Sequence, residues 1–382
     1  MRNSAAVVVI GGGVIGASIA YHLARKGARD IVLLEKNYLA SGSTGRCAAG
    51  VRQQFGTEMN CRLSKRSLEM FENLNEELAY KNDIEFKQKG YLILAYTQKE
   101  WDQFKKNVAL QQSLGIPSRL VTPYEAGQIV PTMNTQGLLG ATFCARDGHC
   151  NPFHTTVAYG EAAGRLNVEL SCCTTVTGLD VRDGQVWGVT TDKGYIESRT
   201  VVIAAGAYSQ TIAEMAGVTI PNYAERHQIL VTEPVDPVQN PMVISFSRRF
   251  YCQQTPRGGF VMGMGDANEP KDFDIGHSWQ FLEEVTRVAC DIIPSLAEAR
   301  MVRQWSGLYD MTPDAQPVLG TLPGVSGCYI ATGFSGHGFM LGPVTGLVMA
   351  EMILGMETSL DVSMLDLGRF ERGELIIEPS VV

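Results

Sequence analysis

The sequence lacks the features that mark several large classes of protein. No stretch approaches 18 uninterrupted apolar residues, and the apolar segment 5–24 is interrupted by four glycines, so neither a transmembrane helix nor a targeting signal is predicted. The nine cysteines include no C-x-x-C pair and no zinc-type Cys/His spacing, which predicts reduced thiols in the cytoplasm and no metal site. Positive charge is scarce, and the net charge of −8 argues against a nucleic-acid partner.

What is present indicates a folded α/β protein. The 382 residues are enough for two to three domains, or for one large α/β unit with an inserted lobe. Hydrophobic residues make up 45% and charged residues 19%, which is close to the average globular protein and excludes a disordered chain. The 40 glycines cluster in short apolar runs without a Gly-X-Y period, a pattern that suggests close approach of the backbone to a ligand.

The first 35 residues predict the opening βαβ unit of a doubly wound fold. Residues 6–10 are an unbroken apolar run, typical of a strand buried on both faces of a parallel sheet. From Val14 onward the apolar residues recur at helical spacing, and Gly27 supplies a stop signal. A second apolar strand, residues 31–34, then ends at Glu35.

The turn between the first strand and the first helix matches the dinucleotide-binding fingerprint G-x-G-x-x-G. Gly11 suits the tight turn, Gly13 lets the backbone reach a pyrophosphate, and Gly16 allows close packing of helix on strand. Glu35, 19 residues beyond Gly16, stands where an acid accepts hydrogen bonds from a ribose diol. Strand, helix and acid together predict a bound dinucleotide, the alternative being glycine turns of a ligand-free α/β protein.

The rest of the chain predicts a second lobe interleaved with the first, because there is no internal repeat or long linker. The patterns predict helices over 59–80, 98–115 and 338–354, and strands over 90–94, 168–170, 176–181, 186–191, 201–206, 229–232, 249–253, 259–264 and 329–333. We therefore expect a discontinuous dinucleotide-binding domain of residues 1–80, 145–220 and 300–382, and a substrate domain of residues 81–144 and 221–299.

Glycine-rich segments far apart in the sequence favour FAD over NAD. The second strand runs into the polar segment 41–46, where an NAD domain usually continues with regular βαβ units. Glycines also end the buried strands at Gly206 and Gly333. Three such segments suit a long, buried cofactor that is held throughout its length.

With these residues assembled, the chain resembles the D-amino-acid oxidase superfamily of flavoenzymes, and within it the β subunits of heteromeric sarcosine oxidase and dye-linked L-proline dehydrogenase. The resemblance covers nearly the whole chain. Besides the fingerprint, it is carried by segments 42–46, 52–55, 90–92, 312–314 (after Trp305 and Tyr309), 333–339 and 370–375. The most specific segment is Gly-Phe-Ser-Gly-His-Gly-Phe at 333–339.

The resemblance implies a Rossmann-like FAD-binding domain interleaved with an antiparallel-sheet substrate domain, an α+β second lobe. It also implies FAD-dependent oxidation of an amino acid or secondary amine, by transfer of a hydride equivalent to flavin N5, giving an imine that water hydrolyses. The residues expected to hold cofactor are Gly11, Gly13, Val14, Ile15, Gly16, Glu35, Lys36, Ser43, Thr44, Arg46, Val176, Ala205, Gly206, Gly307, Gly333, Gly336, His337, Gly338, Phe339 and Met340.

Four residues are expected at the substrate. Arg52 matches the position from which relatives bind the substrate carboxylate, and its planar fork of donors suits that geometry. His337 belongs to the loop that approaches the flavin pyrimidine, where a structural hydrogen bond is as plausible as a catalytic role. Tyr251 and Tyr309 are candidates to line the pocket, against the alternative of ordinary half-buried tyrosines.

Three departures from the relatives matter, and the two that replace lysines point away from a self-sufficient oxidase. Gly307 replaces a cysteine that attaches FAD in monomeric sarcosine oxidases, which implies non-covalent FAD. Met340 and Val261 stand where those oxidases have lysines. Electrons would then leave through an FMN at the interface with a larger α subunit. His154 roughly aligns with the histidine that carries covalent FMN in heteromeric sarcosine oxidase, but an ordinary polar histidine is the competing reading.

The resulting hypothesis is the catalytic β subunit of a heteromeric dehydrogenase or oxidase, with a larger α subunit and small electron-transfer subunits as partners. Its substrate would be of proline, hydroxyproline, sarcosine or opine type. One alternative is a stand-alone glycine or sarcosine oxidase that produces hydrogen peroxide. Others are a non-catalytic FAD-binding electron-relay subunit and an NAD-dependent dehydrogenase.

Overall fold

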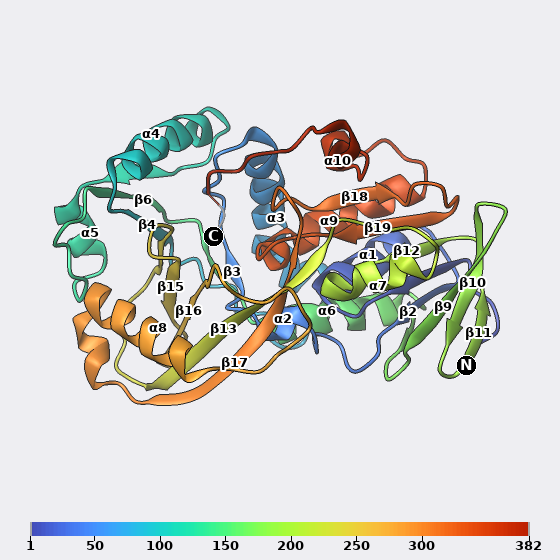
Figure 1. Cartoon of the computed structure of the whole chain (residues 1–382), viewed down its shortest axis with the longest axis horizontal. Helices are drawn as coiled ribbons and strands as arrows, with labels where there is room; N and C mark the ends of the chain where they lie inside the picture. The colour runs from blue at the N-terminus through green and yellow to red at the C-terminus, as the bar shows by residue number, and fades with distance from the viewer. Residues whose placement is uncertain (1, 381–382) are drawn as a thin grey trace.

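The computed structural model describes residues 2–380 and contains two lobes, each built on one large sheet (Figure 1). The sheet of the dinucleotide lobe has six strands in the order β18-β19-β12-β1-β2-β8. All neighbours in it run parallel except the edge pair β18–β19. The strands are β1 (Val7–Ile10), β2 (Ile31–Leu34), β8 (Glu169–Ser171), β12 (Val201–Ile203), β18 (Val318–Thr321) and β19 (Cys328–Thr332).

Helices cover this sheet and bury the first helix from Gly16 to Ala24. The helices of the lobe are α1 (Val14–Arg25), α3 (Glu58–Glu77), α6 (Pro152–Arg165), α7 (Ser209–Glu214) and α9 (Gly338–Ile353). Helix α1 packs against both α9 and α6. A Cβ on Gly346 of α9 would overlap Ser18 of α1, so the two helices approach each other at backbone distance. The fingerprint helix is thus held from both sides.

The second lobe contains an eight-stranded sheet in the order β17-β13-β16-β15-β14-β4-β6-β5. Its strands are β4 (Tyr91–Ala95), β5 (Arg119–Val121), β6 (Gly140–Cys144), β13 (Tyr223–Pro234), β14 (Met242–Ser245), β15 (Phe250–Gln254), β16 (Gly259–Met264) and β17 (Met301–Met311). Every pair is antiparallel except β14–β4, so the predicted antiparallel sheet contains one parallel step. Helices α4 (Gln98–Ser113), α5 (Pro123–Ile129) and α8 (Trp279–Ile292) flank it (Figure 1).

The remaining elements are short. A three-stranded sheet lies at the far end of the dinucleotide lobe, and a two-stranded ribbon lies beside the second sheet (Figure 1). These elements are α2 (Ser43–Arg46), α10 (Arg369–Arg372), β3 (Gly50–Val51), β7 (Gly148–His149), β9 (Val176–Arg182), β10 (Gln185–Thr191), β11 (Gly194–Glu197), η1 (Gly206–Tyr208), η2 (Pro294–Glu298) and η3 (Ser363–Leu365). No helix among residues 2–380 has the length and apolar character needed to cross a membrane.

The predicted fold class is confirmed, with corrections in detail. Strand β17 pairs with β13, with Met311 opposite Tyr223 at one end and Met301 opposite Thr232 at the other. It therefore belongs to the second sheet, whereas the predicted division gave residues 300–382 to the dinucleotide domain. On this criterion the boundary moves from residue 300 to residue 311.

Helices α5, α6 and α8 were not predicted. For α6 the signal was present, because Asn151 caps the helix by accepting from two backbone N–H groups and Pro152 follows it.

Candidate active site

A cavity of about 570 Å³ lies between the lobes and is lined by segments from both. This volume is within the usual range for cofactor and ligand sites, roughly 300–1,000 Å³. The dinucleotide lobe contributes the fingerprint turn, residues 204–208 and residues 334–340, and the second lobe contributes side chains from β4, β13, β15 and β17. The site is therefore shared between a nucleotide-binding sheet and a second, mainly antiparallel sheet.

The fingerprint turn has the geometry that the sequence predicts. Gly11 has φ +115°, and a Cβ there would overlap the carbonyl oxygen of Ala204, so no other residue fits. A Cβ on Gly16 would overlap the Gly11 carbonyl oxygen, so Gly16 serves helix packing and does not line the cavity. Gly13 and Val14 line the cavity at the N-terminus of α1, whose helix dipole favours a phosphate.

Glu35 follows β2 and is oriented by three donors. Its carboxylate accepts hydrogen bonds from the backbone N–H of Gly12 (2.7 Å), the N–H of Asn37 (2.8 Å) and the hydroxyl of Ser41 (3.3 Å). The side chain lines the cavity, as an acid for a ribose diol must. Next to it, the Lys36 ammonium lies 3.3 Å from the centre of the Tyr208 ring.

The polar segment after β2 fastens the two lobes together. The Ser43 hydroxyl donates to the Leu308 carbonyl at 2.5 Å, and Arg46 Nη1 donates to the Ser306 carbonyl at 2.9 Å, both on β17. Thr44 accepts from the Val14 N–H at 3.2 Å. Ser43, Thr44, Arg46 and Gly307 all line the cavity, so this segment holds the first helix and the second sheet around one space.

The loop before α9 places an unpartnered histidine in the cavity wall. Gly336 has φ +88°, and a Cβ there would overlap the Tyr309 ring. His337 is 2% exposed, and neither of its ring nitrogens has a hydrogen-bond partner among residues 2–380. Burial, and then the nearby Arg52, lower the pKa of His337 to about 3, so its imidazole is neutral at physiological pH. A buried polar ring of this kind calls for a partner in the cavity.

The cavity wall also contains a buried cation, Arg52. It is 5% exposed and lines the cavity, and it forms no ion pair with any residue from 2 to 380. Its Nη1 donates to the Gln54 carbonyl and its Nη2 to the Ser380 carbonyl, both at 2.5 Å, while the guanidinium lies 4.0 Å from the centre of the Phe55 ring. The carboxylates of Glu378 and Asp147 interact with Arg52 electrostatically but form no ion pair with it, so a carboxylate bound in the cavity would supply a direct partner for this buried charge.

Tyrosine rings form much of the remaining wall. Tyr251 and Tyr309 line the cavity as predicted, and burial raises the pKa of both phenols, so they stay protonated. The Tyr309 ring stacks on His227 at 3.5 Å between ring centres and 8° between planes. Tyr91 also lines the cavity, and its hydroxyl packs against Gly50, where a Cβ would overlap it.

Sequence reasoning missed His227 and Tyr91. His227 lies in the interior of β13, and nothing in the strand pattern distinguishes it from other partly buried positions. Tyr91 lies in the segment 90–92 that carries part of the resemblance, but the apolar run gave no reason to single out its hydroxyl. Contacts across the sheet bring both residues to the cavity.

Nearly all the predicted site residues lie on the cavity wall, and three do not. Gly16 packs α1 on β1, as described above. Gly333 has φ +76° and donates its N–H to the Asp310 carboxylate at 2.5 Å. His154 lies on α6 outside the cavity, with its Nδ1 hydrogen-bonded to the Tyr80 hydroxyl at 2.8 Å. The residues on the wall are Gly11, Gly13, Val14, Ile15, Glu35, Lys36, Ser43, Thr44, Arg46, Arg52, Val176, Ala205, Gly206, Tyr251, Gly307, Tyr309, Gly336, His337, Gly338, Phe339 and Met340.

Comparison with known proteins identifies the family. The FAD dependent oxidoreductase family, DAO, matches residues 6–352. This chain belongs to that family. Sarcosine oxidase subunit beta of Rhodobacter capsulatus is 30% identical over 379 residues, which cover 97% of this chain and 90% of that one. Dimethylglycine dehydrogenase of Rattus norvegicus is 29% identical over 97% of this chain but 45% of its own length.

Solved structures agree in fold. L-proline dehydrogenase from P. horikoshii superposes with a TM-score of 0.94 at 39% identity, covering 98% of this chain and 100% of that one. Glycine oxidase from Geobacillus kaustophilus superposes with a TM-score of 0.89 at 25% identity, covering 96% and 99%. The predicted class, FAD-dependent oxidation of an amino acid or amine, is confirmed. The glycine cradle at Gly11 and Gly13, the oriented Glu35 and the unpartnered His337 fit FAD.

Proposed function

We propose that this FAD-dependent oxidoreductase acts on a substrate that carries both a carboxylate and an amine, of proline, hydroxyproline, sarcosine or opine type. The observation that carries the proposal is Arg52, a buried cation in the cavity wall with no acidic partner among residues 2–380. A substrate carboxylate supplies that partner, and the free donors of the guanidinium suit its planar geometry. Relatives named for sarcosine, proline and glycine agree with this choice.

Each wall residue then has a distinct task. The fingerprint turn, Glu35 and the 334–340 loop would hold FAD, which would supply the acceptor for the hydride equivalent from the carbon next to the amine nitrogen. Arg52 fixes the carboxylate and thereby the orientation of that carbon. His337, neutral at working pH, offers hydrogen bonds without adding a second positive charge beside Arg52. The rings of Tyr251 and Tyr309 exclude water from the reacting carbon.

We also propose that the protein is the catalytic β subunit of a heteromeric dehydrogenase with a larger α subunit, small electron-transfer subunits and an FMN at the interface. The support is that two relatives named as beta subunits align with 97% and 99% of this chain, and that the aligned regions make up 90% of the Rhodobacter capsulatus protein and 94% of the Arthrobacter protein. Met340 contributes an apolar side chain to the cavity wall, at a position where monomeric sarcosine oxidases have a lysine. Gly307 offers no thiol, which supports non-covalent FAD. His154 lies outside the cavity. An FMN near His154 would therefore have to bind outside the cavity as well.

The proposed location is the cytoplasm. All nine cysteines lie within residues 2–380 and none forms a disulfide there. Free thiols are typical of a reducing compartment.

An anaerobic titration of the FAD-loaded protein tests the substrate proposal. Proline, hydroxyproline, sarcosine and an opine are added one at a time, and loss of the oxidised flavin absorption band is recorded. We expect at least one of them to bleach the flavin, and Arg52→Ala to raise the half-saturating concentration about 100-fold, since a charge-assisted carboxylate contact is lost. Bleaching with unchanged half-saturation in Arg52→Ala would contradict the assignment.

A second candidate, a stand-alone oxidase, is favoured by the similarity to glycine oxidase. It is distinguished by hydrogen peroxide formation when the isolated chain turns over in air.

Acid denaturation of the purified complex, followed by separation of protein and flavins, decides the cofactor proposals. Release of all FAD and FMN supports non-covalent binding, whereas flavin fluorescence retained on this chain would indicate covalent attachment, with His154→Ala testing that residue.

A further inference from the structure

The chain segment that follows α10 returns to the active site and contacts Arg52. The Ser380 carbonyl accepts the hydrogen bond from Arg52 Nη2, so one of the two backbone contacts of the buried guanidinium comes from a residue 328 positions away. The matched family region ends at residue 352, so this contact lies beyond it. The contact between Arg52 and residue 380 therefore needs its own explanation.

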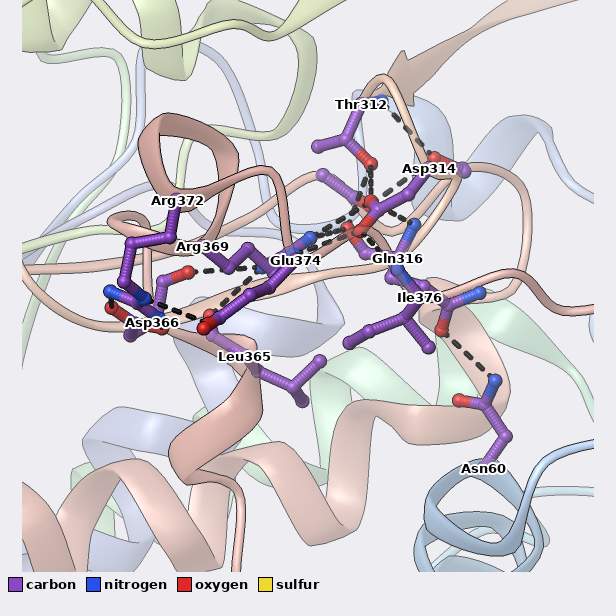
Figure 2. Close-up of polar contacts among 12 residues, drawn as sticks. Asn60, Thr312, Asp314, Gln316, Leu365, Asp366, Arg369, Arg372, Glu374 and Ile376 are labelled. Atoms are coloured by element: carbon purple, nitrogen blue, oxygen red, sulfur yellow. Dashed lines mark hydrogen bonds and ion pairs between the residues drawn. The ribbon is translucent and has the colours of Figure 1, made fainter.

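The first anchor of this segment is a buried ion pair. Arg369 and Asp314 form two hydrogen bonds of 2.9 Å each, and both side chains are 1% exposed (Figure 2). Arg369 also donates to the Gln316 carbonyl at 2.9 Å, and Asp314 accepts from the Ile376 N–H at 3.2 Å (Figure 2). The chain after α10 is thus fixed to the turn that follows β17.

The second anchor is Glu378, whose carboxylate accepts five hydrogen bonds. Its Oε1 accepts from the N–H groups of Gly56 (2.7 Å) and Ser380 (2.9 Å). Its Oε2 accepts from the N–H and hydroxyl of Thr57 (3.0 and 2.8 Å) and from Asn60 Nδ2 (3.0 Å). Thr57 is the N-cap residue of α3 but makes no capping bond with its own side chain, so Glu378 supplies the negative group at this helix end.

The two anchors are joined, and the fit around them is close. Asn60 Nδ2 also donates to the Gln316 side chain at 2.9 Å, which links Glu378 to the Arg369 network (Figure 2). A Cβ on Gly56 would overlap the Pro379 ring, and Asn107 donates to the Ser380 hydroxyl at 2.9 Å. The position of the Ser380 carbonyl is therefore fixed from several directions.

We propose that Glu378 is a positioning residue for substrate binding, and that residues 376–380 form a latch that holds the Arg52 guanidinium in its carboxylate-binding orientation. The latch and the Gln54 carbonyl engage one donor on each terminal nitrogen, which leaves the other donors of Arg52 for the cavity. This inference rests on the proposed function, because it assumes that Arg52 binds a carboxylate.

Charge and geometry give opposite expectations for Glu378→Gln. Glu378 lies close enough to Arg52 for their charges to interact. If only charge mattered, removing this negative group would strengthen the binding of an anionic ligand to Arg52. The latch predicts weaker binding, because the amide nitrogen of glutamine cannot accept the hydrogen bonds that one carboxylate oxygen now accepts. The direction of the change therefore separates the two explanations.

The experiment uses the FAD-loaded full chain and acetate as the probe, with acetamide as its uncharged counterpart. Binding is followed by the change in the visible flavin spectrum. We expect Glu378→Gln to weaken acetate binding about tenfold and to leave acetamide binding within twofold. Glu374→Gln is the matched control, because Glu374 precedes the latch, is exposed and, among residues 2–380, its carboxylate pairs only with Arg372. It should bind acetate like the unmodified chain.

A second pair of variants tests the latch without changing charge. Gly56→Ala should displace Pro379 and weaken acetate binding in the same way, and adding Pro379→Ala should restore it, because the overlapping ring atoms are removed. FAD content and melting temperature establish that each variant is folded. Folded Glu378→Gln or Gly56→Ala chains that bind acetate as tightly as the unmodified chain, or more tightly, would overturn the latch.

The failure of the latch and the failure of the proposed function look different. Acetate binding that is lost in Arg52→Ala but kept in Glu378→Gln overturns the latch alone. Acetate binding that survives Arg52→Ala, or no saturable response in the unmodified chain, contradicts the carboxylate site itself and overturns both proposals.

Discussion

The dinucleotide end of the cavity is lined largely by residues 10–15 and 34–37, which are close together in the sequence, whereas the substrate end is lined by residues from distant segments, among them Arg52, Tyr251 and His337. Glu35 accepts three hydrogen bonds, so this carboxylate at the first end is satisfied before any ligand binds. At the second end, Arg52 forms no ion pair and His337 has no hydrogen-bond partner among residues 2–380. Polar groups left unsatisfied cost stability, and proteins retain them where a ligand completes them.

The largest expected effect lies at the dinucleotide end of the cavity. Gly11→Val places a branched side chain against the Ala204 carbonyl at a backbone conformation with φ +115°. Overlap and strain together should cost about 4 kcal/mol or more and abolish FAD binding. The measurement is the flavin-to-protein absorbance ratio of the purified chain, with thermal unfolding alongside. A Gly11→Val chain with full flavin content would show that the turn is less rigid than its geometry indicates.

A buried ion pair behind the substrate end gives the next effect. Arg369→Met leaves the Asp314 carboxylate buried without its partner, and breaking such a pair costs about 3–5 kcal/mol. Burial alone would raise the pKa of Asp314, but the two hydrogen bonds from Arg369 lower it, so the carboxylate is charged at neutral pH.

Arg372→Gln is the matched control for Arg369→Met, since Arg372 lies in the same short helix and pairs with Asp366 and Glu374 at the surface (Figure 2). It should cost less than about 1 kcal/mol. Urea unfolding of the two variants measures the difference. Equal losses would mean that burial of the Arg369 pair contributes nothing.

The same contrast explains what the sequence could reveal. The fingerprint, Glu35 and the glycine-rich turns were predictable because each depends on neighbours within a few residues or on a backbone conformation that only glycine adopts. Arg52 and His337 could be named only through the resemblance. Tyr91, His227 and the contact between Arg52 and Ser380 depend on sheet register and on a chain segment hundreds of residues away, and no local pattern encodes them.

Two buried groups, His22 and Asp147, should respond to acid in opposite ways. His22, on α1 below the dinucleotide site, is 4% exposed, and burial followed by Arg25 lowers its pKa to about 3. The unfolded chain therefore binds a proton between about pH 6.5 and 3 that the folded chain does not, and stability falls as the pH falls through that window. His22→Leu should reduce this slope by about 1.4 kcal/mol per pH unit between pH 4 and 6. Urea unfolding in pH steps measures it, and above pH 7 the slopes should coincide.

Asp147, which interacts electrostatically with Arg52, changes the stability in the opposite direction as the pH falls. Burial raises its pKa to about 6, although hydrogen bonds from Gln54 and Gln53 oppose the shift. The folded chain then binds the extra proton between about pH 3.8 and 6, so this group gains stability as the pH falls through 6. Asp147→Asn removes that gain and should steepen the acid loss that His22→Leu relieves. Variants that change the slope in the same direction would contradict the assignment of the two groups.

The smallest expected effect tests whether unpaired polar groups at the substrate end bind the substrate. The Tyr91 hydroxyl lines the cavity and has no hydrogen-bond partner among the residues described, and its ring lies close enough to Arg52 for the two to interact electrostatically. If it donates to the substrate carboxylate beside Arg52, Tyr91→Phe should raise KM roughly five- to tenfold, about 1 kcal/mol, with kcat little changed. The melting temperature should stay the same or rise, because no bond within the protein is lost. A fall in melting temperature with unchanged KM would instead assign the hydroxyl to the fold, and the two ends would then differ less than their geometry suggests.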